Sequence, residues 1–213
     1  MRVILLGFLL VVVSGTWLWA EDKIESYRQL TQAKEFLKEG RIQEATNELQ
    51  KIINNDPHQV QAYLLLALAL QRRSQPDEQK ILAVLTKAVE IAPNNPDPHL
   101  LLAQSHSRLR ANNQAIEEFQ KTITLGGDIS TLVSAHLGLM AIYKRLGQQE
   151  KAQREFANAC RLAPEVKDLV EQAEINEVTP KPILDYLQIE DGIHPPLKER
   201  VKRLQEKRAG GKP

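Results

Sequence analysis

The stretch "GRIQEATNELQKIINNDP", residues 40–57, decides the fold of this 213-residue chain because it recurs along the sequence. "GQQEKAQREFANACRLAP", residues 147–164, matches it closely, and "KAVEIAPNNPD", residues 87–97, repeats its last part. The aligned segments share three columns: Ala45, Ile81, Ala115 and Ala152; Leu49, Leu85, Phe119 and Phe156; and Pro57, Pro93, Gly127 and Pro164. Subtraction within the first column gives separations of 36, 34 and 37 residues. A period of about 34 residues with helical apolar spacing and a closing proline indicates an array of helix–turn–helix repeats.

The composition supports a helical domain and excludes some classes of function. Ala, Leu, Glu, Gln and Lys, which lose little conformational freedom in a helix, dominate the middle of the chain. The length and the 42% of hydrophobic residues suffice for one domain with appendages. The formal net charge of +1 provides no overall field that would recruit nucleic acid. The single cysteine, Cys160, excludes an internal disulfide framework and a CxxC pair.

The first helix of each repeat carries further aligned columns. They hold Gln29, Tyr63, His99 and His136; then, four residues later, Ala33, Ala67, Ala103 and Met140; then, three residues later, Phe36, Leu70, His106 and Tyr143. This pattern resembles the tetratricopeptide repeat (TPR) family, which has Trp, Leu-Gly and Tyr on its first helix (A) and Ala, Phe and Pro on its second (B). The resemblance covers about two-thirds of the chain, and Gln32 and Met140 depart from the family pattern.

The resemblance implies an all-α, right-handed solenoid of about four TPR repeats, at residues 26–59, 60–95, 96–129 and 133–166. Extra residues in "RRSQPDEQK" (72–80) and "GGDIST" (126–131) account for the uneven spacing. After this array (26–164), apolar residues recur at helical spacing, at Val166, Leu169, Val170 and Ala173. We therefore expect residues 165–178 to form a helix that caps the last repeat.

The A helices of TPR proteins line a concave groove in which peptides bind, and the resemblance places two columns of this chain there. The first column holds Leu30, Leu64, Leu100 and Leu137, and the second, one turn later, holds Lys34, Leu68, Gln104 and Ala141. A row of leucines would suit an apolar peptide stretch or an amphipathic helix. The alternative is that these leucines pack against neighbouring A helices or under the C-terminus of the chain.

A basic row beside this groove is a candidate rim for an acidic peptide. It consists of Lys38, Arg72, Arg108 and Arg145. TPR repeats commonly carry a solvated lysine at this column, and we favour that interpretation. The lysine–asparagine carboxylate clamp of chaperone-tail-binding TPR proteins is not supported, because Leu30 and Leu65 stand at the corresponding columns.

The N-terminus is expected to direct export. An apolar run over residues 3–13 follows Arg2, and Ser14 and Gly15 break it. This pattern indicates a signal peptide over residues 1–20 that is cleaved near Ala20 and leaves a periplasmic or secreted protein.

The alternative is a retained membrane anchor formed by residues 3–20, which carry no charge. Trp17 and Trp19 would then lie at the membrane interface. The segment does not end in a cysteine, so lipidation at that position is excluded.

Catalytic, metal and cofactor sites are not expected. His99, His106 and His136 lack partners at metal-ligand spacing, and we expect them to replace the aromatic residues of the family as packing residues. Cys160 has no neighbouring histidine to activate it, so a buried thiol is expected, with a mixed disulfide after export as the alternative. The sequence has no phosphate-binding loop or nucleophile elbow. We therefore expect that this protein is not an enzyme.

Residues 179–213 form a proline-broken, basic C-terminal tail. Its last part, residues 197–213, has seven basic and two acidic residues, a net charge of +5. We interpret it as a solvated segment, with attraction to an anionic membrane or an acidic partner as the alternative. A further hypothesis is that "PILDYLQI", residues 182–189, folds into the leucine-lined groove until a partner displaces it.

Together these features predict an exported, non-catalytic adaptor that holds a peptide segment of a protein partner and assists assembly of a cell-envelope complex. The alternative is a membrane-anchored structural component that self-associates by stacking its repeats. A protein or peptide partner is expected, and nucleic acid is not. Membrane contact could come from the N-terminus or from the basic tail, and the sequence does not define the oligomeric state.

Overall fold

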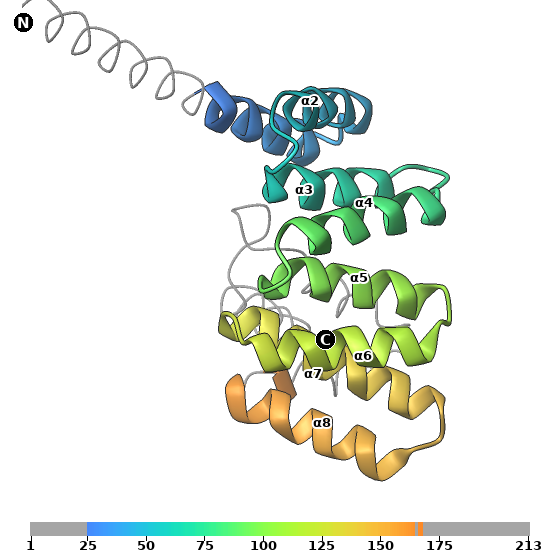
Figure 1. Ribbon diagram of the computed structural model, residues 1–213. Helices are drawn as coiled ribbons and strands as arrows, with labels where there is room; N and C mark the ends of the chain where they lie inside the picture. The colour runs from blue at the N-terminus through green and yellow to red at the C-terminus, as the bar shows by residue number, and fades with distance from the viewer. Residues whose placement is uncertain (1–24, 165, 168–213) are drawn as a thin grey trace, which may run out of the picture. The chain divides into compact units, whose positions relative to one another are not determined.

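The computed structural model describes residues 25–164, 166 and 167, and these form helices joined by short turns, without a strand (Figure 1). A helix over residues 25–38 comes first. It is followed by α2 (Ile42–Asn55), α3 (Val60–Gln71), α4 (Glu78–Ile91), α5 (Pro96–Arg108), α6 (Asn112–Leu125), α7 (Ile129–Arg145) and α8 (Gln149–Leu162). The predicted all-α TPR fold is confirmed. The helix at 25–38, α3, α5 and α7 are the A helices, and the even-numbered helices are the B helices.

The chain divides into two compact units, Met1–Ser74 and Gln75–Pro213. In the first unit α2 packs against α3, and nine successive residues of α3, Ala62 to Leu70, are buried. In the second unit each helix from α4 to α8 packs against the next, and α5 also contacts α7. Direct contact between neighbouring A helices is how TPR repeats share a core, since one hairpin cannot bury its apolar face alone.

The aligned small residues lie where helices approach most closely. Ala33, Ala67 and Ala103 on the A helices have no exposed surface, and neither do Ala45 and Ala115 on the B helices. In repeat 4 a glycine two residues before Met140 allows an additional close approach. A Cβ atom built on Gly138 of α7 would overlap the ring of Phe119 on α6, which is itself buried.

Polar side chains begin three of the helices. Asp77, Asn95 and Asp128 accept hydrogen bonds from the backbone N–H groups of Lys80, Asp97 and Thr131, at 3.0, 3.1 and 2.7 Å. These N-caps satisfy donors that the first turn of a helix leaves unpaired. The extra residues predicted at 72–80 form a longer connection between α3 and α4. Those predicted at 126–131 do not lengthen the connection between α6 and α7, and instead extend α7, which has 17 residues.

Three A helices end in the same turn, in which one residue takes a left-handed conformation. The φ angle is 75° at Gly40, 61° at Arg110 and 72° at Gly147. After Arg110 the N–H of Ala111 bonds to the carbonyl oxygen of His106 at 2.9 Å, and the same bond forms after the two glycines. This is the Schellman arrangement, which favours glycine because a Cβ is crowded there. Arg110 is the only non-glycine residue with positive φ in the described part of the chain.

Most of the predicted terminal segments lie outside the described residues. This applies to the export segment (1–20), the tail (179–213) and the predicted capping helix except for Val166 and Lys167. Val166 is buried in the core of the second unit, and its N–H bonds to the carbonyl oxygen of Ala163 at 3.0 Å. None of the helices within the described residues is both long and apolar enough to span a membrane.

Candidate partner-binding site

The predicted groove residues of the first compact unit lie on the helix at 25–38 and on α3. Leu30, Leu64 and Leu68 are 5%, 4% and 3% exposed, whereas Lys34 is partly exposed. The leucines thus contribute to the core of this unit, and Lys34 is the accessible member of the set.

The predicted groove residues of the second unit lie on α5 and α7, which contact each other. Leu100, Leu137 and Gln104 are buried, and Ala141 is partly exposed. The two leucines belong to the same apolar cluster as Phe119. Packing against the unit's own helices therefore accounts for these leucines, and Ala141 is the accessible predicted contact. Peptide binding at either set remains a prediction.

The predicted basic rim is engaged in contacts within the protein. Lys38 pairs with Glu35 on its own helix at 2.7 Å. The three arginines instead reach back by about one repeat: Arg72 donates to the carbonyl oxygen of Leu37 at 3.2 Å, Arg108 to Glu78 at 3.3 Å, and Arg145 to Asn112 at 2.5 Å and Ser107 at 3.5 Å. Each arginine thus links the end of its A helix to residues of an earlier helix or turn.

Arg145 lies in an electrostatically unfavourable position. Partial burial lowers the pKa of its guanidinium below the usual arginine range, and the nearby charge of Arg110 lowers it further. Its described hydrogen bonds go to the neutral groups of Ser107 and Asn112. The end of α7 therefore concentrates positive charge next to the turn after α5.

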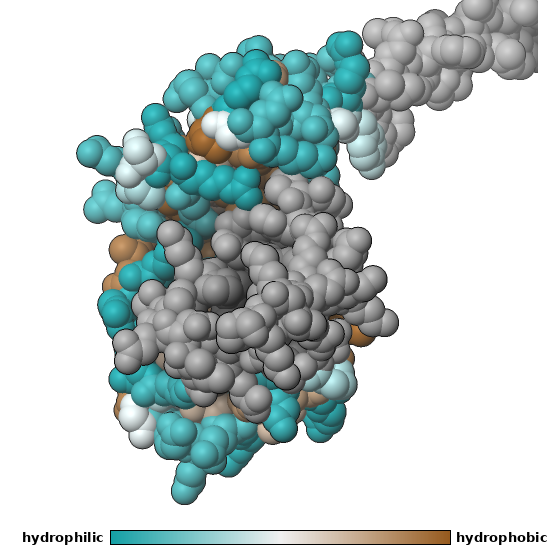
Figure 2. All heavy atoms as spheres, turned by 180° about the vertical axis from the view of Figure 1, so that it is seen from behind, coloured by the Kyte–Doolittle hydropathy of each residue, from teal (hydrophilic) through white to brown (hydrophobic). Residues whose placement is uncertain are grey.

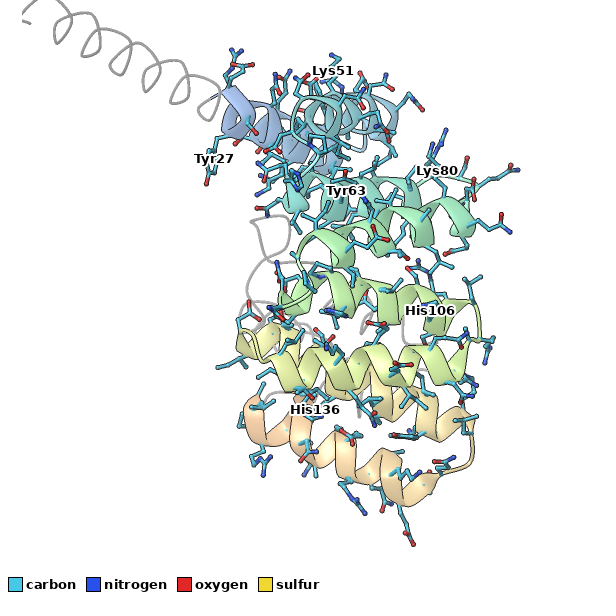
Figure 3. All side chains as sticks on the ribbon, viewed as in Figure 1. Tyr27, Lys51, Tyr63, Lys80, His106 and His136 are labelled. Atoms are coloured by element: carbon cyan, nitrogen blue, oxygen red, sulfur yellow. The ribbon has the colours of Figure 1, made fainter. Side chains whose placement is uncertain are left out.

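The two histidines at corresponding positions of repeats 3 and 4 form the same contact. His99 Nδ1 lies 2.7 Å from Glu118 Oε2, and His136 Nδ1 lies 2.7 Å from Glu155 Oε2. His136 is labelled in Figure 3. Each pair joins the A helix of a repeat to its B helix. Because the partners are 19 residues apart, a search for metal ligands at short spacing does not reveal them.

Two side chains of the column that holds Tyr63, His99 and His136 also form hydrogen bonds to the end of the preceding repeat. His99 Nε2 lies 3.0 Å from the carbonyl oxygen of Pro93, and the Tyr63 hydroxyl donates to the carbonyl oxygen of Pro57 at 3.1 Å. These residues are buried, so the histidine acts as a packing residue with satisfied polar atoms.

Groups of side chains that could hold a metal ion are not found among the described residues. No cluster of three or more His, Cys, Asp or Glu side chains occurs there. Cys160 is partly buried on α8, and His106 is partly exposed at the end of α5. Figure 2 shows a largely hydrophilic described surface in that view, with hydrophobic atoms in small patches.

These features define a TPR-type helical repeat protein, and solved structures with the same fold are similar to it. A MamA crystal structure aligns with a TM-score of 0.59 over 88% of this chain and 96% of its own, at 15% identity. TTC0263, a thermophilic TPR protein of Thermus thermophilus, aligns with a TM-score of 0.60 over 71% and 80% of the two chains, at 19% identity. A structure of MamA from Desulfovibrio magneticus RS-1, residues 41 to the end, aligns with a TM-score of 0.55 over 64% of this chain and 75% of its own, at 20% identity. Similarity at these identities shows the fold alone. No protein-family model matches the sequence, and neither does any curated protein.

Proposed function

We propose that this protein is a non-catalytic scaffold that binds a peptide segment of a protein partner on the face formed by the A helices α5 and α7 of its second compact unit. The observation that carries the proposal is the direct contact of α5 with α7, whose corresponding residues Leu100 and Leu137 belong to one apolar cluster. Successive A helices then present corresponding residues side by side, and TPR arrays bind extended ligands along such faces.

On this face the buried leucines pack the helices together, and more exposed residues are left to contact a ligand. Leu100 and Leu137 hold α5 and α7 together from inside the cluster. Ala141, one turn after Leu137, is small and partly exposed, so it leaves room for a ligand side chain. Ser107 and Lys144, one turn further on, supply hydrogen-bond donors near the ends of the same helices.

The test uses Ala141 rather than the buried leucines. An aspartate at Leu64 or Leu100 would bury an unpaired carboxylate and could unfold the repeat. Ala141→Arg instead places a long charged side chain on the proposed face. Ala157→Arg is the matched control, because Ala157 is an exposed alanine on the B helix α8.

A photo-crosslinking residue placed at position 141 or at position 157 of the full chain identifies the partner in cells. We expect one protein to be captured from position 141 and not from position 157. Binding of that purified partner should be lost with Ala141→Arg and kept with Ala157→Arg, with helicity unchanged in both. Equal binding by the two arginine variants would refute binding on the A-helix face.

Export and a role in assembling a cell-envelope complex belong to the same proposal and rest on the apolar segment at residues 3–20. Sequencing the N-terminus of the mature protein tests it. A mature protein that starts at Glu21 is a released envelope protein, whereas one that retains Met1 and fractionates with membranes is anchored. A protein that retains Met1 and remains in the cytosol contradicts export.

A further inference from the structure

Two exposed leucines occupy the same position in the turns of repeats 3 and 4. Leu109 is 44% exposed after α5, and Leu146 is 41% exposed after α7. Large apolar side chains exposed at matching positions call for an explanation, since scattered exposure would not follow the repeat. Leu109 lies between Arg108 and Arg110, and Leu146 follows Lys144 and Arg145. We define the turn edge as Arg108, Leu109, Arg110, Lys144, Arg145 and Leu146.

The two turns form one surface because Arg145 joins them. Its guanidinium donates to Ser107 before the first turn and to Asn112 after it, at 3.5 and 2.5 Å. The charge of Arg110 also lowers the pKa of Arg145, which places the two cations close together. All of these residues lie within the second compact unit.

The turn edge includes cations that form no ion pair with a described carboxylate. Arg108 pairs with Glu78, but within the described chain no ion pair joins Arg110 or Arg145 to a carboxylate. Arg110 also takes the left-handed conformation that glycine occupies in the equivalent turns of repeats 1 and 4. A strained backbone and crowded cations both cost stability, and such costs are characteristic of residues kept for binding.

We propose that the turn edge is the docking surface for residues 183–192 of the same chain, "ILDYLQIEDG". This segment has three carboxylates, at Asp185, Glu190 and Asp191, and no basic residue, so its charge complements the turn edge. Its aliphatic residues suit the two exposed leucines, and a guanidinium can bind a carboxylate through two parallel hydrogen bonds. The docking proposal does not rest on peptide binding at the A-helix face, although Lys144 belongs to both surfaces.

The chain is long enough for this contact. The described residues end at Lys167, after the C-terminal end of α8, whereas the turn edge adjoins the start of α8. The 14-residue helix α8 is about 21 Å long at 1.5 Å per residue. The 15 residues from 168 to 182 can span about 50 Å when extended.

Disulfide trapping in the full chain tests the docking. In a Cys160→Ser background, Leu109→Cys is combined with Tyr186→Cys, and the control combines Ala157→Cys with Tyr186→Cys. Position 157 is exposed on α8 and outside the turn edge. We expect the 109–186 disulfide to form at least about tenfold faster than the 157–186 disulfide, because docking raises the effective concentration of the two thiols. High salt should reduce the difference.

Two further variants separate docking from folding defects. Leu146→Cys combined with Tyr186→Cys should form a disulfide as fast as Leu109→Cys combined with Tyr186→Cys. Adding Arg110→Gly should slow trapping by removing one cation, while relaxing the backbone of the turn. Equal rates at positions 109 and 157, or no effect of Arg110→Gly and salt, would overturn the proposal. Disulfide-linked dimers would assign the segment to a second copy of the chain and would also overturn it.

Discussion

Replacing Arg110 by glycine should stabilise the protein. Arg110 holds a φ of 61° at the end of α5, where Gly40 and Gly147 hold 75° and 72° in the equivalent turns. The left-handed conformation costs a residue with a Cβ about 1–2 kcal/mol. Glycine avoids this cost but loses about 0.5–1 kcal/mol more backbone entropy on folding. The difference predicts that Arg110→Gly raises the free energy of unfolding by about 0.5–1 kcal/mol.

Thermal unfolding followed by far-UV circular dichroism measures this effect. A change of about 1 kcal/mol moves the Tm of a chain of this size by about 2–4 °C, so we expect a rise of about 1–4 °C. Urea unfolding should show a higher midpoint with an unchanged slope.

Arg110→Ala is the control, since it removes the guanidinium as glycine does but keeps the Cβ. Its stability should stay within about 0.5 kcal/mol of the parent. If both variants raise the Tm equally, the gain comes from removing charge next to Arg145, and the backbone argument is wrong. A lower Tm for Arg110→Gly would also refute the reasoning.

Three other expectations concern packing, pairing and assembly. Gly138→Ala should destabilise the protein by about 1–3 kcal/mol in urea unfolding, because its Cβ overlaps the ring of Phe119, and adding Phe119→Leu should recover part of the loss. A double-mutant cycle of His99→Gln and Glu118→Gln should give a coupling of about 0.5–3 kcal/mol, and additive losses would show that the 2.7 Å contact contributes nothing. If the protein is an adaptor rather than a self-stacking component, its sedimentation coefficient should not change over a wide concentration range.

The sequence predicts the helices of this protein well because repetition makes the local signals agree. The columns through Ala45 and Ala115 and through Ala33 and Ala103 identified buried helix contacts, and the closing prolines marked the ends of the B helices. A property shared by four repeats is much less ambiguous than a single helical pattern.

Side-chain partners were harder to predict because they depend on how the helices pack. The histidine column was expected to hold packing residues, yet its pairing with Glu118 and Glu155 spans 19 residues and two helices. The arginines of the predicted rim reach back by 30 or more residues. Nothing in one sequence distinguishes such a contact from a solvated charge.

The burial of the groove leucines shows the same limit. Leu100 and Leu137 fall at helix positions that face a groove in the family pattern, and a sequence column gives the direction of a side chain but not the depth at which it lies. Gly138 was not recognised either, because its importance comes from Phe119 in the preceding repeat.

The duplicated histidine–glutamate contact has a consequence for the length of the array. His99 and His136 are 37 residues apart, as are Glu118 and Glu155. Deleting residues 100–136 would join His99 to Leu137 and set Glu155 at the 19-residue separation that Glu118 now has. Gain or loss of one 37-residue repeat would therefore recreate the histidine–glutamate contact without a compensating substitution. A single recombination event in this part of the gene is thus compatible with a change in the number of repeats.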